Sequence, residues 1–162
     1  MKDIKIVVGS NWGDEGKGMM TDYFSSQPNT IVVCCNGGAQ RGHTVITPDG
    51  IRHVFHHFGS GTFNNASTYL SENFIVNPML FKQEFDELKR LKLIPKVYIN
   101  CNCKVTTPWD MMANQIIEES RGKNKHGSCG LGIFETIKRY EASCTDLDYD
   151  IRKYYEDKFK TN

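Results

Sequence analysis

The sequence predicts an α/β protein in which a mostly parallel sheet carries flanking helices and a β-hairpin insertion. The first observation is an apolar run at residues 4–8, followed by a helical segment at 16–25 and a second apolar run at 30–35. This order of strand, helix and strand predicts that 4–8 and 30–35 are adjacent and parallel. The second observation is a Pro-Asp-Gly turn between short runs at 43–46 and 51–55, which indicates a hairpin.

The following residues continue the alternation of strands and helices. Residues 68–76 predict a short strand, and an Asn-Pro pair opens a helix over 77–93. A strand at 96–100 and a helix beginning at Thr107 with a capping-box-like pattern come next. Residues 146–162 are charged with interspersed aromatics, and both a helix and a frayed tail remain open for them. The apolar face of the helix after Thr107 is expected to pack in the core; it comprises Trp109, Met112, Ala113, Ile116 and Ile117.

Length and composition bound the class of protein. The 162 residues are expected to form a single domain, and the net charge of +1 gives no indication of a nucleic-acid or acidic-membrane partner. No apolar run has the length needed to span a membrane. Cys34 and Cys35 are adjacent within an apolar run, so we interpret the six cysteines as reduced thiols and predict a cytoplasmic location.

The chemistry concentrates in a glycine-rich loop, residues 9–18, between the first predicted strand and helix. It holds four glycines together with Asp14, Glu15 and Lys17. Glycines let a backbone approach an anion, and a helix N-terminus presents unpaired N–H groups to it. Gly18 stands where a standard P-loop has Ser or Thr, so a metal ligand must come from Asp14 or a backbone carbonyl. The alternative is a strand-to-helix turn without a ligand.

Three further segments strengthen a resemblance to one family. The first loop contains WGDEGKG, and residues 36–45 read NGGAQRGHTV. Both resemble signatures of adenylosuccinate synthetase, which joins IMP to aspartate using GTP, and they occur in the family's order and spacing. Residues 57–62 and 126–133 resemble two more of its segments. The match extends over about residues 4–133, and no counterpart of the family's guanine- and aspartate-binding parts is found.

The resemblance implies the fold, the roles of individual residues and a cofactor. The fold would be a P-loop-NTPase-like sheet, with residues 1–162 as the N-terminal, phosphate-binding part. Asp14 would be the base that deprotonates purine N1, His43 the acid, and Lys17 a catalytic partner of the phosphate charge. Mg²⁺ would bind Asp14 and the Gly42 carbonyl. The implied nucleotide- and phosphate-binding residues are Gly13, Asp14, Glu15, Gly16, Lys17, Gly18, Gln40, Arg41, Gly42, His43, Thr44, Ser128 and Cys129.

The sequence departs from the family pattern at several of these positions. Gln40 replaces an asparagine, and Arg41 replaces an alanine, which either adds a phosphate contact or crowds the pocket. Gly59 stands where proline is usual, and Cys129 stands where a threonine hydroxyl is usual, with Ser128 beside it. A thiol is a weaker hydrogen-bond donor than a hydroxyl. The histidines of the hairpin region are interpreted as structural; they are His53, His56 and His57.

The implied activity is GTP-dependent ligation of IMP and L-aspartate in purine biosynthesis, incomplete in this chain alone. The implied partners are GTP, IMP and L-aspartate, and a homodimer like that of the family is left open. Alternatives are a non-catalytic phosphate-binding remnant and a member that acts on a 2-amino-purine nucleotide. An unrelated structural α/β protein is a third alternative, which the paired motifs disfavour.

Overall fold

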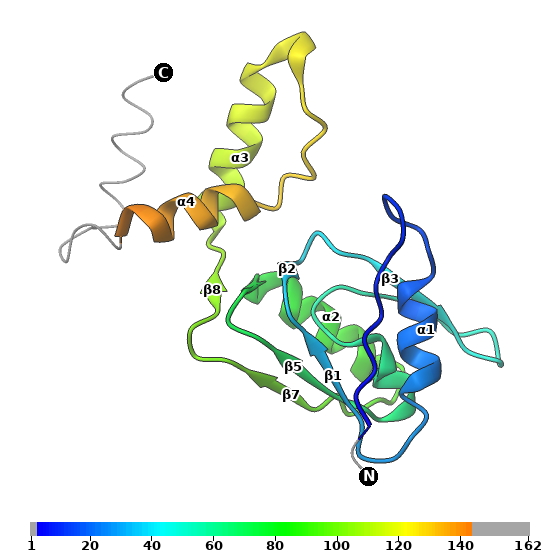
Figure 1. Cartoon of the computed structure of the whole chain (residues 1–162). Coiled ribbons are helices and arrows are strands. Elements are labelled where there is room, and N and C mark those ends of the chain that lie inside the picture. Colours follow the sequence, from blue (N-terminus) through cyan, green and yellow to red (C-terminus); the bar gives the residue numbers. More distant parts are fainter. Residues whose placement is uncertain (1–2, 144–162) are drawn as a thin grey trace.

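The computed structural model describes residues 3–143, which form a mixed α/β fold with mostly parallel strands. The charged segment 146–162 lies outside these described residues. Two three-stranded parallel sheets and one antiparallel hairpin carry the helices (Figure 1). The predicted fold class is therefore confirmed. The helices are α1 Lys17–Phe24, α2 Pro78–Arg90, α3 Pro108–Ser120 and α4 Ile133–Ser143.

The first sheet has the order β1-β5-β7, with all strands parallel. Its members are β1 Ile31–Cys34, β5 Ser67–Leu70 and β7 Val97–Ile99. Their inward side chains, Cys34 and Leu70, pack in one apolar cluster with Phe74 of the neighbouring sheet. The predicted strands at 30–35 and 96–100 are thus confirmed, but the partner of β1 is β5.

The second sheet has the order β2-β6-β8 and is also parallel. It contains β2 Gly37–Gly38, β6 Phe74–Val76 and β8 Lys104–Val105. The single strand predicted at 68–76 is in fact two strands in separate sheets. A turn, in which the Phe74 N–H donates to the Ser71 carbonyl at 2.9 Å, divides them.

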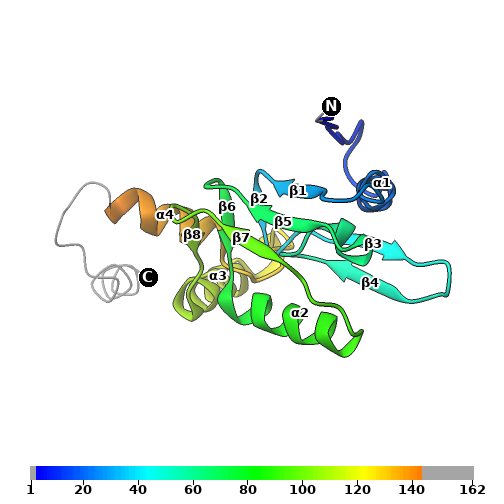
Figure 2. The ribbon, with the colours of Figure 1, turned by 90° about the horizontal axis from the view of Figure 1, so that it is seen from below.

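The predicted hairpin is confirmed. β3 His43–Ile46 pairs antiparallel with β4 Arg52–Phe55 around the Thr47–Gly50 turn. The Gly50 N–H donates to the Thr47 carbonyl at 2.9 Å, and Gly50 has a φ of +87°, which favours glycine. The hairpin extends from one end of the molecule (Figure 2) and begins at His43, a predicted site residue.

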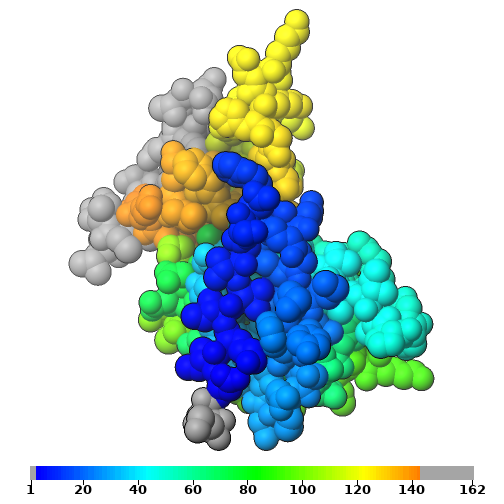
Figure 3. Space-filling model, turned by 45° about the vertical axis from the view of Figure 1, so that its right-hand side comes forward, coloured from blue at the N-terminus to red at the C-terminus, as the bar shows by residue number. Residues whose placement is uncertain are grey.

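The predicted strand at 4–8 does not form. Residues 4–8 are extended but belong to no sheet, so the prediction that they pair with 30–35 is wrong. Ile4, Ile6 and Val8 are 86%, 82% and 78% exposed. In Figure 3 this N-terminal segment runs along the outside of the molecule. A strand is stabilised by ladder hydrogen bonds and by burial of its apolar face, and within residues 3–143 this segment has neither.

The helices confirm the cap predictions but not every predicted buried face. Asn77 caps α2 by accepting from the N–H groups of Met79 and Leu80. Thr107 and Asp110 form the expected capping box of α3. On α3 only Ala113 of the predicted core face is buried, because α3 and α4 pack on each other at one end of the molecule, away from the main sheet (Figure 1). None of the described helices has the length and apolarity required to cross a membrane.

Candidate functional site

The glycine-rich loop is organised around the carboxylate of Glu15. Its Oε1 accepts hydrogen bonds from the N–H groups of Asn11 at 2.9 Å and Gly13 at 3.1 Å. Its Oε2 accepts from the Lys17 ammonium. The hydrogen bond from Lys17, helped by these backbone donors, lowers the pKa of Glu15 to about 2. An internal anion therefore occupies the donors of this loop.

The backbone of the loop uses conformations that favour glycine. Gly13 and Gly16 have φ values of +135° and +76°, and Gly16 precedes the first residue of α1. Asp14 lies between them with a φ of +56°, in the left-handed region that aspartate tolerates better than most residues. Asp14 is exposed, so this turn presents its carboxylate at the molecular surface.

Gly18 brings the loop and His43 together. A Cβ on Gly18 would lie 2.9 Å from the Cβ of His43 and 3.0 Å from its carbonyl carbon. No larger residue fits without displacing the start of β3. The end of the first loop and the end of the second glycine segment are therefore adjacent, as their predicted shared site requires.

The electrostatic environment of His43 is positive. Burial lowers the pKa of His43 below its ordinary value of 6.5, and the nearby charges of Arg41 and Lys17 lower it further. The imidazole is half-buried. His43 is therefore neutral at pH 7 in the free chain, and an anion bound beside it would raise its proton affinity.

The second glycine segment also touches the start of α4. A Cβ on Gly38 would lie 2.9 Å from the Cδ1 of Ile133. Ala39 and Leu131 line a common hollow of about 400 Å³ between the hairpin and α2. Gln40, Gly42 and Thr44 are exposed. Residues 36–44 thus lie between the first and third glycine segments.

Of the two residues predicted to bind phosphate in the third segment, Ser128 is hydrogen-bonded to α3. The Ser128 hydroxyl donates to Asn114 Oδ1 at 2.8 Å, and the Ser128 N–H donates to Glu118 Oε1 at 3.2 Å. Cys129 is exposed. In the part of the chain that the structure describes, neither residue is hydrogen-bonded to residues 9–18 or 36–44. The structure therefore brings together the first two predicted segments more closely than the third.

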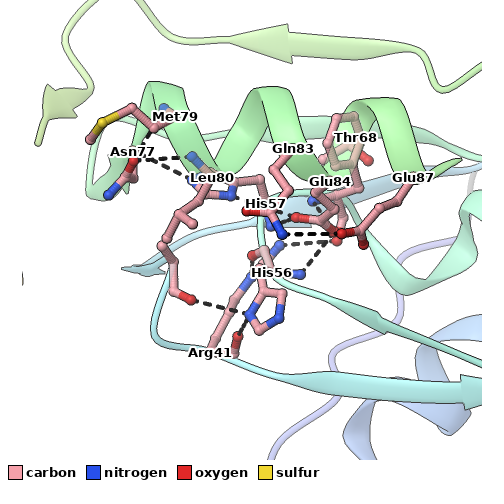
Figure 4. Close-up of polar contacts among 12 residues, drawn as sticks. Arg41, His56, His57, Thr68, Asn77, Met79, Leu80, Gln83, Glu84 and Glu87 are labelled. Carbon is pink, nitrogen blue, oxygen red and sulfur yellow. Dashed lines mark hydrogen bonds and ion pairs between the residues drawn. The ribbon is translucent and has the colours of Figure 1, made fainter. Parts of the chain in front are cut away.

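A polar cluster around Arg41 was not predicted from the sequence (Figure 4). The Arg41 guanidinium donates to the carbonyls of His56 and Phe58 and lies 4.8 Å from the centroid of the Phe74 ring. Glu84 of α2, 4% exposed, accepts from the N–H groups of His56 and His57. An acidic residue on the buried face of a helix was the sequence signal for this cluster.

The donor set suits the Mg²⁺ ion that the family resemblance implies. The carboxylate of Asp14 and the backbone carbonyl of Gly42, both exposed residues, are oxygen ligands of the kind that Mg²⁺ prefers. Among the described residues no group of three or more His, Cys, Asp or Glu side chains is placed to hold a metal ion.

Comparison with known proteins decides the family. The sequence model of the family described as adenylosuccinate synthetase matches residues 6–151. The chain belongs to the adenylosuccinate synthetase family. The match includes the glycine-rich loop, the segment around His43 and the third glycine segment, so the sequence-based resemblance is confirmed.

Curated family members show how much of the enzyme this chain represents. It is 35% identical to the adenylosuccinate synthetase of Synechocystis sp. over 133 residues, which are 81% of this chain and 30% of the relative. It is 29% identical to that of Borrelia duttonii over 161 residues, which are 98% of this chain and 37% of the relative. The chain therefore spans about a third of the length of these relatives.

Solved structures support the same assignment. A fully ligated adenylosuccinate synthetase from Plasmodium falciparum is similar with a TM-score of 0.70 and 25% identity, over 83% of this chain and 32% of that one. A succinoaminodeoxyadenylate synthetase from cyanophage S-2L, bound to dGMP and dATP, has a TM-score of 0.54 and 18% identity, over 65% of this chain and 30% of that one. The second likeness concerns the fold alone.

Proposed function

We propose that residues 1–162 form the N-terminal, phosphate-binding part of an adenylosuccinate synthetase that joins IMP to L-aspartate at the expense of GTP. The observation that carries this proposal is the direct packing of Gly18 on His43, within a family match over residues 6–151. This packing brings a lysine-bearing anion loop and an imidazole to one place. A GTP-dependent ligase needs such a combination to hold phosphate charge and transfer protons.

The proposed roles follow from the chemistry of each side chain. Asp14, an exposed carboxylate, removes the N1 proton of the purine so that O6 attacks the γ-phosphate. His43 donates a proton or hydrogen bond to the leaving β-phosphate, whose charge raises its pKa from the lowered value of the free chain. Lys17 breaks its ion pair with Glu15 and instead neutralises the negative charge of the transferred phosphate. Asp14 and the Gly42 carbonyl would hold Mg²⁺, which would supply additional positive charge for the phosphates.

The proposed binding surface extends beyond these residues. Backbone N–H groups of the glycine-rich loop bind phosphate, and the side chain of Gln40 contacts the purine base. Ser128 and Cys129 contact the nucleotide phosphate after release of the Ser128–Asn114 hydrogen bond. The residues that contribute backbone groups to this surface are Gly13, Glu15, Gly16, Gly18 and Thr44.

A cytoplasmic location is proposed on the basis of the free thiols among the described cysteines.

A second candidate function is phosphate or nucleotide binding without catalysis. The chain spans 30–37% of the length of the adenylosuccinate synthetases of Synechocystis sp. and Borrelia duttonii, so this function is considered for the 162-residue chain in isolation. Positioning two substrates supplies about 7–11 kcal/mol in well-oriented reactions. We therefore expect the 162-residue chain by itself to make adenylosuccinate far more slowly than a full-length family enzyme.

Binding is tested by NMR on the ¹⁵N-labelled chain with GDP and Mg²⁺. We expect the amide signals of residues 13–18 and 40–44 to shift. Lys17→Ala should weaken the shifts, and Lys92→Ala, at an exposed position after α2, is the matched control. Signals that move only outside both segments would contradict the proposed site.

Catalysis is tested by adenylosuccinate formation from IMP, GTP and aspartate. We expect no robust turnover by the chain alone, and turnover when a fragment carrying the remaining two thirds of a family enzyme is added. Asp14→Ala and His43→Ala should abolish that turnover. Robust activity of the chain alone, lost in both variants, would overturn the expected incompleteness while supporting the roles. Restored turnover that survives both substitutions would refute the roles.

A further inference from the structure

Two loops of the protein are tied together by reciprocal side-chain contacts with the backbone. The His56 Nδ1 atom contacts the carbonyl oxygens of Ala39, at 3.1 Å, and of Arg41. Carbonyl oxygens only accept hydrogen bonds, so Nδ1 carries the proton in this arrangement. In the other direction, the Arg41 guanidinium donates to the His56 and Phe58 carbonyls, the latter at 3.2 Å. Each loop therefore holds the backbone of the other.

Glu84 anchors this pair of contacts to α2. Its carboxylate accepts from the N–H groups of His56 at 2.9 Å, His57 at 2.7 Å and Phe58 at 3.4 Å. The next N–H group, that of Gly59, donates to the Thr68 hydroxyl at 2.8 Å (Figure 4). An irregular, largely buried loop thus has its backbone donors satisfied by side chains, which fixes its conformation.

His57 extends the anchor to the N-terminus of α2. Its Nε2 accepts from the Asn77 N–H at 3.1 Å, so the neutral ring carries its proton on Nδ1. That atom faces Glu84 Oε2 at 3.5 Å. The buried Glu84 carboxylate is thus faced by the backbone N–H groups of the loop on one side and by the His57 ring on the other.

We propose that Arg41 and His56 are positioning residues, which clamp residues 39–43 against residues 56–58, with Glu84 as the anchor of the clamp. The clamped segment contains the Gly42 carbonyl and His43. His56 fixes the Arg41 carbonyl, which lies in the peptide directly before the one that carries the Gly42 oxygen. The clamp itself is a property of the free chain, and its effect on ligands rests on the proposed function.

The clamp explains the arginine that replaces the family's alanine at position 41. Its planar fork supplies donors at two angles, and the Phe74 ring supports the guanidinium. A lysine has one nitrogen and reaches both carbonyls less well. The segment around Gly42 is thus positioned in this chain by a side chain that the family pattern lacks.

The clamp is tested first by hydrogen–deuterium exchange of the free chain. Arg41→Ala and His56→Ala should speed exchange in residues 39–44 by about tenfold or more, while α3 remains protected. His56→Asn retains an N–H at the position of Nδ1 and should stay near wild type. Arg52→Ala removes an exposed arginine of the same hairpin and is the matched control. Unchanged exchange in residues 39–44 in both alanine variants overturns the clamp.

A second readout separates the clamp from the proposed function. Binding of fluorescent GDP with Mg²⁺ should weaken by about tenfold or more in Arg41→Ala. If the alanine variants exchange faster in residues 39–44 but neither they nor the wild type binds GDP, the clamp is supported and the proposed site is overturned. If Arg41→Ala exchanges rapidly throughout, Arg41→Lys decides: exchange raised only in residues 39–44 and 56–58 supports the clamp, and wild-type exchange there overturns it.

Discussion

His43 illustrates how a single side chain is tuned by its neighbours. Burial and the charges of Arg41 and Lys17 both favour the neutral imidazole. In the proposed role of a general acid, His43 would have to take up a proton when phosphate binds. We therefore expect phosphate binding at the proposed site to be accompanied by proton uptake.

The first prediction concerns the titration of His43. Its pKa in the free chain should lie below 6.5, and Arg41→Ala should raise it because a nearby positive charge is removed. The measurement is a pH titration of the imidazole signals by NMR. Arg52→Ala is the control, and the same pKa in Arg41→Ala as in wild type would contradict the assigned cause.

Gly59, like Arg41, departs from the family pattern, and both residues contact the loop at residues 56–59 or belong to it. Its N–H donates to Thr68, and a Cβ at this position would lie 2.6 Å from the Cβ of Val32. The family's usual proline would lack that donor and add that clash. Its φ of −67° suits proline, so backbone strain does not explain the glycine.

The second prediction therefore concerns Gly59→Pro, which should lower the free energy of unfolding by about 2–4 kcal/mol. Gly59→Ala adds the clash but keeps the N–H, and it should cost less. Val32→Ala should recover part of the loss in either background. Urea denaturation measures all of these, and equal losses for proline and alanine would show that the Thr68 hydrogen bond contributes nothing.

At the scale of elements, α2 is held to the sheet by apolar contacts and by one buried carboxylate. Phe81, Phe85 and Leu88 pack with Phe58 and Phe55 in the second apolar cluster. Glu84 projects from the same face of the helix. Burial raises the pKa of this carboxyl, but the nearby imidazoles of His53 and His57 and the hydrogen bonds from the loop backbone outweigh it and lower the pKa to about 2.

The third prediction is a pH-dependent contribution of Glu84 to stability. The folded-state pKa of about 2 lies below the ordinary 4.5, so the charged form stabilises the fold above pH 4.5 and this stabilisation is lost as pH falls towards 2. The shift corresponds to about 3 kcal/mol. Glu84→Gln should be less stable than wild type at pH 7, and the difference should narrow below pH 4.5. Urea denaturation at each pH measures the difference in free energy of unfolding between the two proteins. A difference that stays constant from pH 7 to pH 2.5 would refute this assignment.

Local signals in the sequence predicted most elements because their causes are local. The Asn-Pro cap, the capping box at Thr107 and the Pro-Asp-Gly turn each satisfy their own backbone groups within a few residues. The short strands β2 and β8 escaped prediction because two residues carry no periodicity. The clamp escaped because it joins positions 41, 56 and 84, whose proximity only the fold creates.

For the candidate site, the sequence predicted residue types and segments but not all contacts. The glycines were interpreted as allowing an anion to approach the backbone, which stays a prediction, whereas the close approach in the structure is that of Gly18 to His43. The pairing of Lys17 with Glu15 was not predicted, because the chain spacing leaves the rotamers of both side chains open. The roles of Asp14, Gln40 and Cys129 remain predictions.

At the scale of the whole molecule, the N-terminal segment and β1 leave large apolar side chains exposed. Ile4, Ile6 and Val8 are more than three-quarters exposed, and Ile31 and Val33 of β1 are 57% and 58% exposed. Residues 4–8 were predicted to form a buried strand because they are an apolar run, and that prediction is wrong, since within residues 3–143 they pair with no strand. An apolar run by itself does not specify the strand with which it would pair.

The fourth prediction contrasts this surface with the core. In the isolated chain Ile6→Lys should change the free energy of unfolding by less than about 0.5 kcal/mol and reduce self-association. Ile75→Lys, at a buried position of β6, should prevent stable folding. Urea denaturation and analytical ultracentrifugation measure the two effects. A large loss of stability in Ile6→Lys would mean that residues 4–8 are covered in solution.

The Glu15–Lys17 pair has a consequence for selectivity among solution anions. Glu15 is joined to the loop donors by only a few bonds, so its effective concentration there is far above that of a free ion. Chloride or a dilute monoanion competes poorly against such a tethered carboxylate. A di- or triphosphate brings several charges at once and meets other donors as it enters. If the loop binds phosphate as we propose, the tethered Glu15 carboxylate favours polyanions over monovalent anions as ligands.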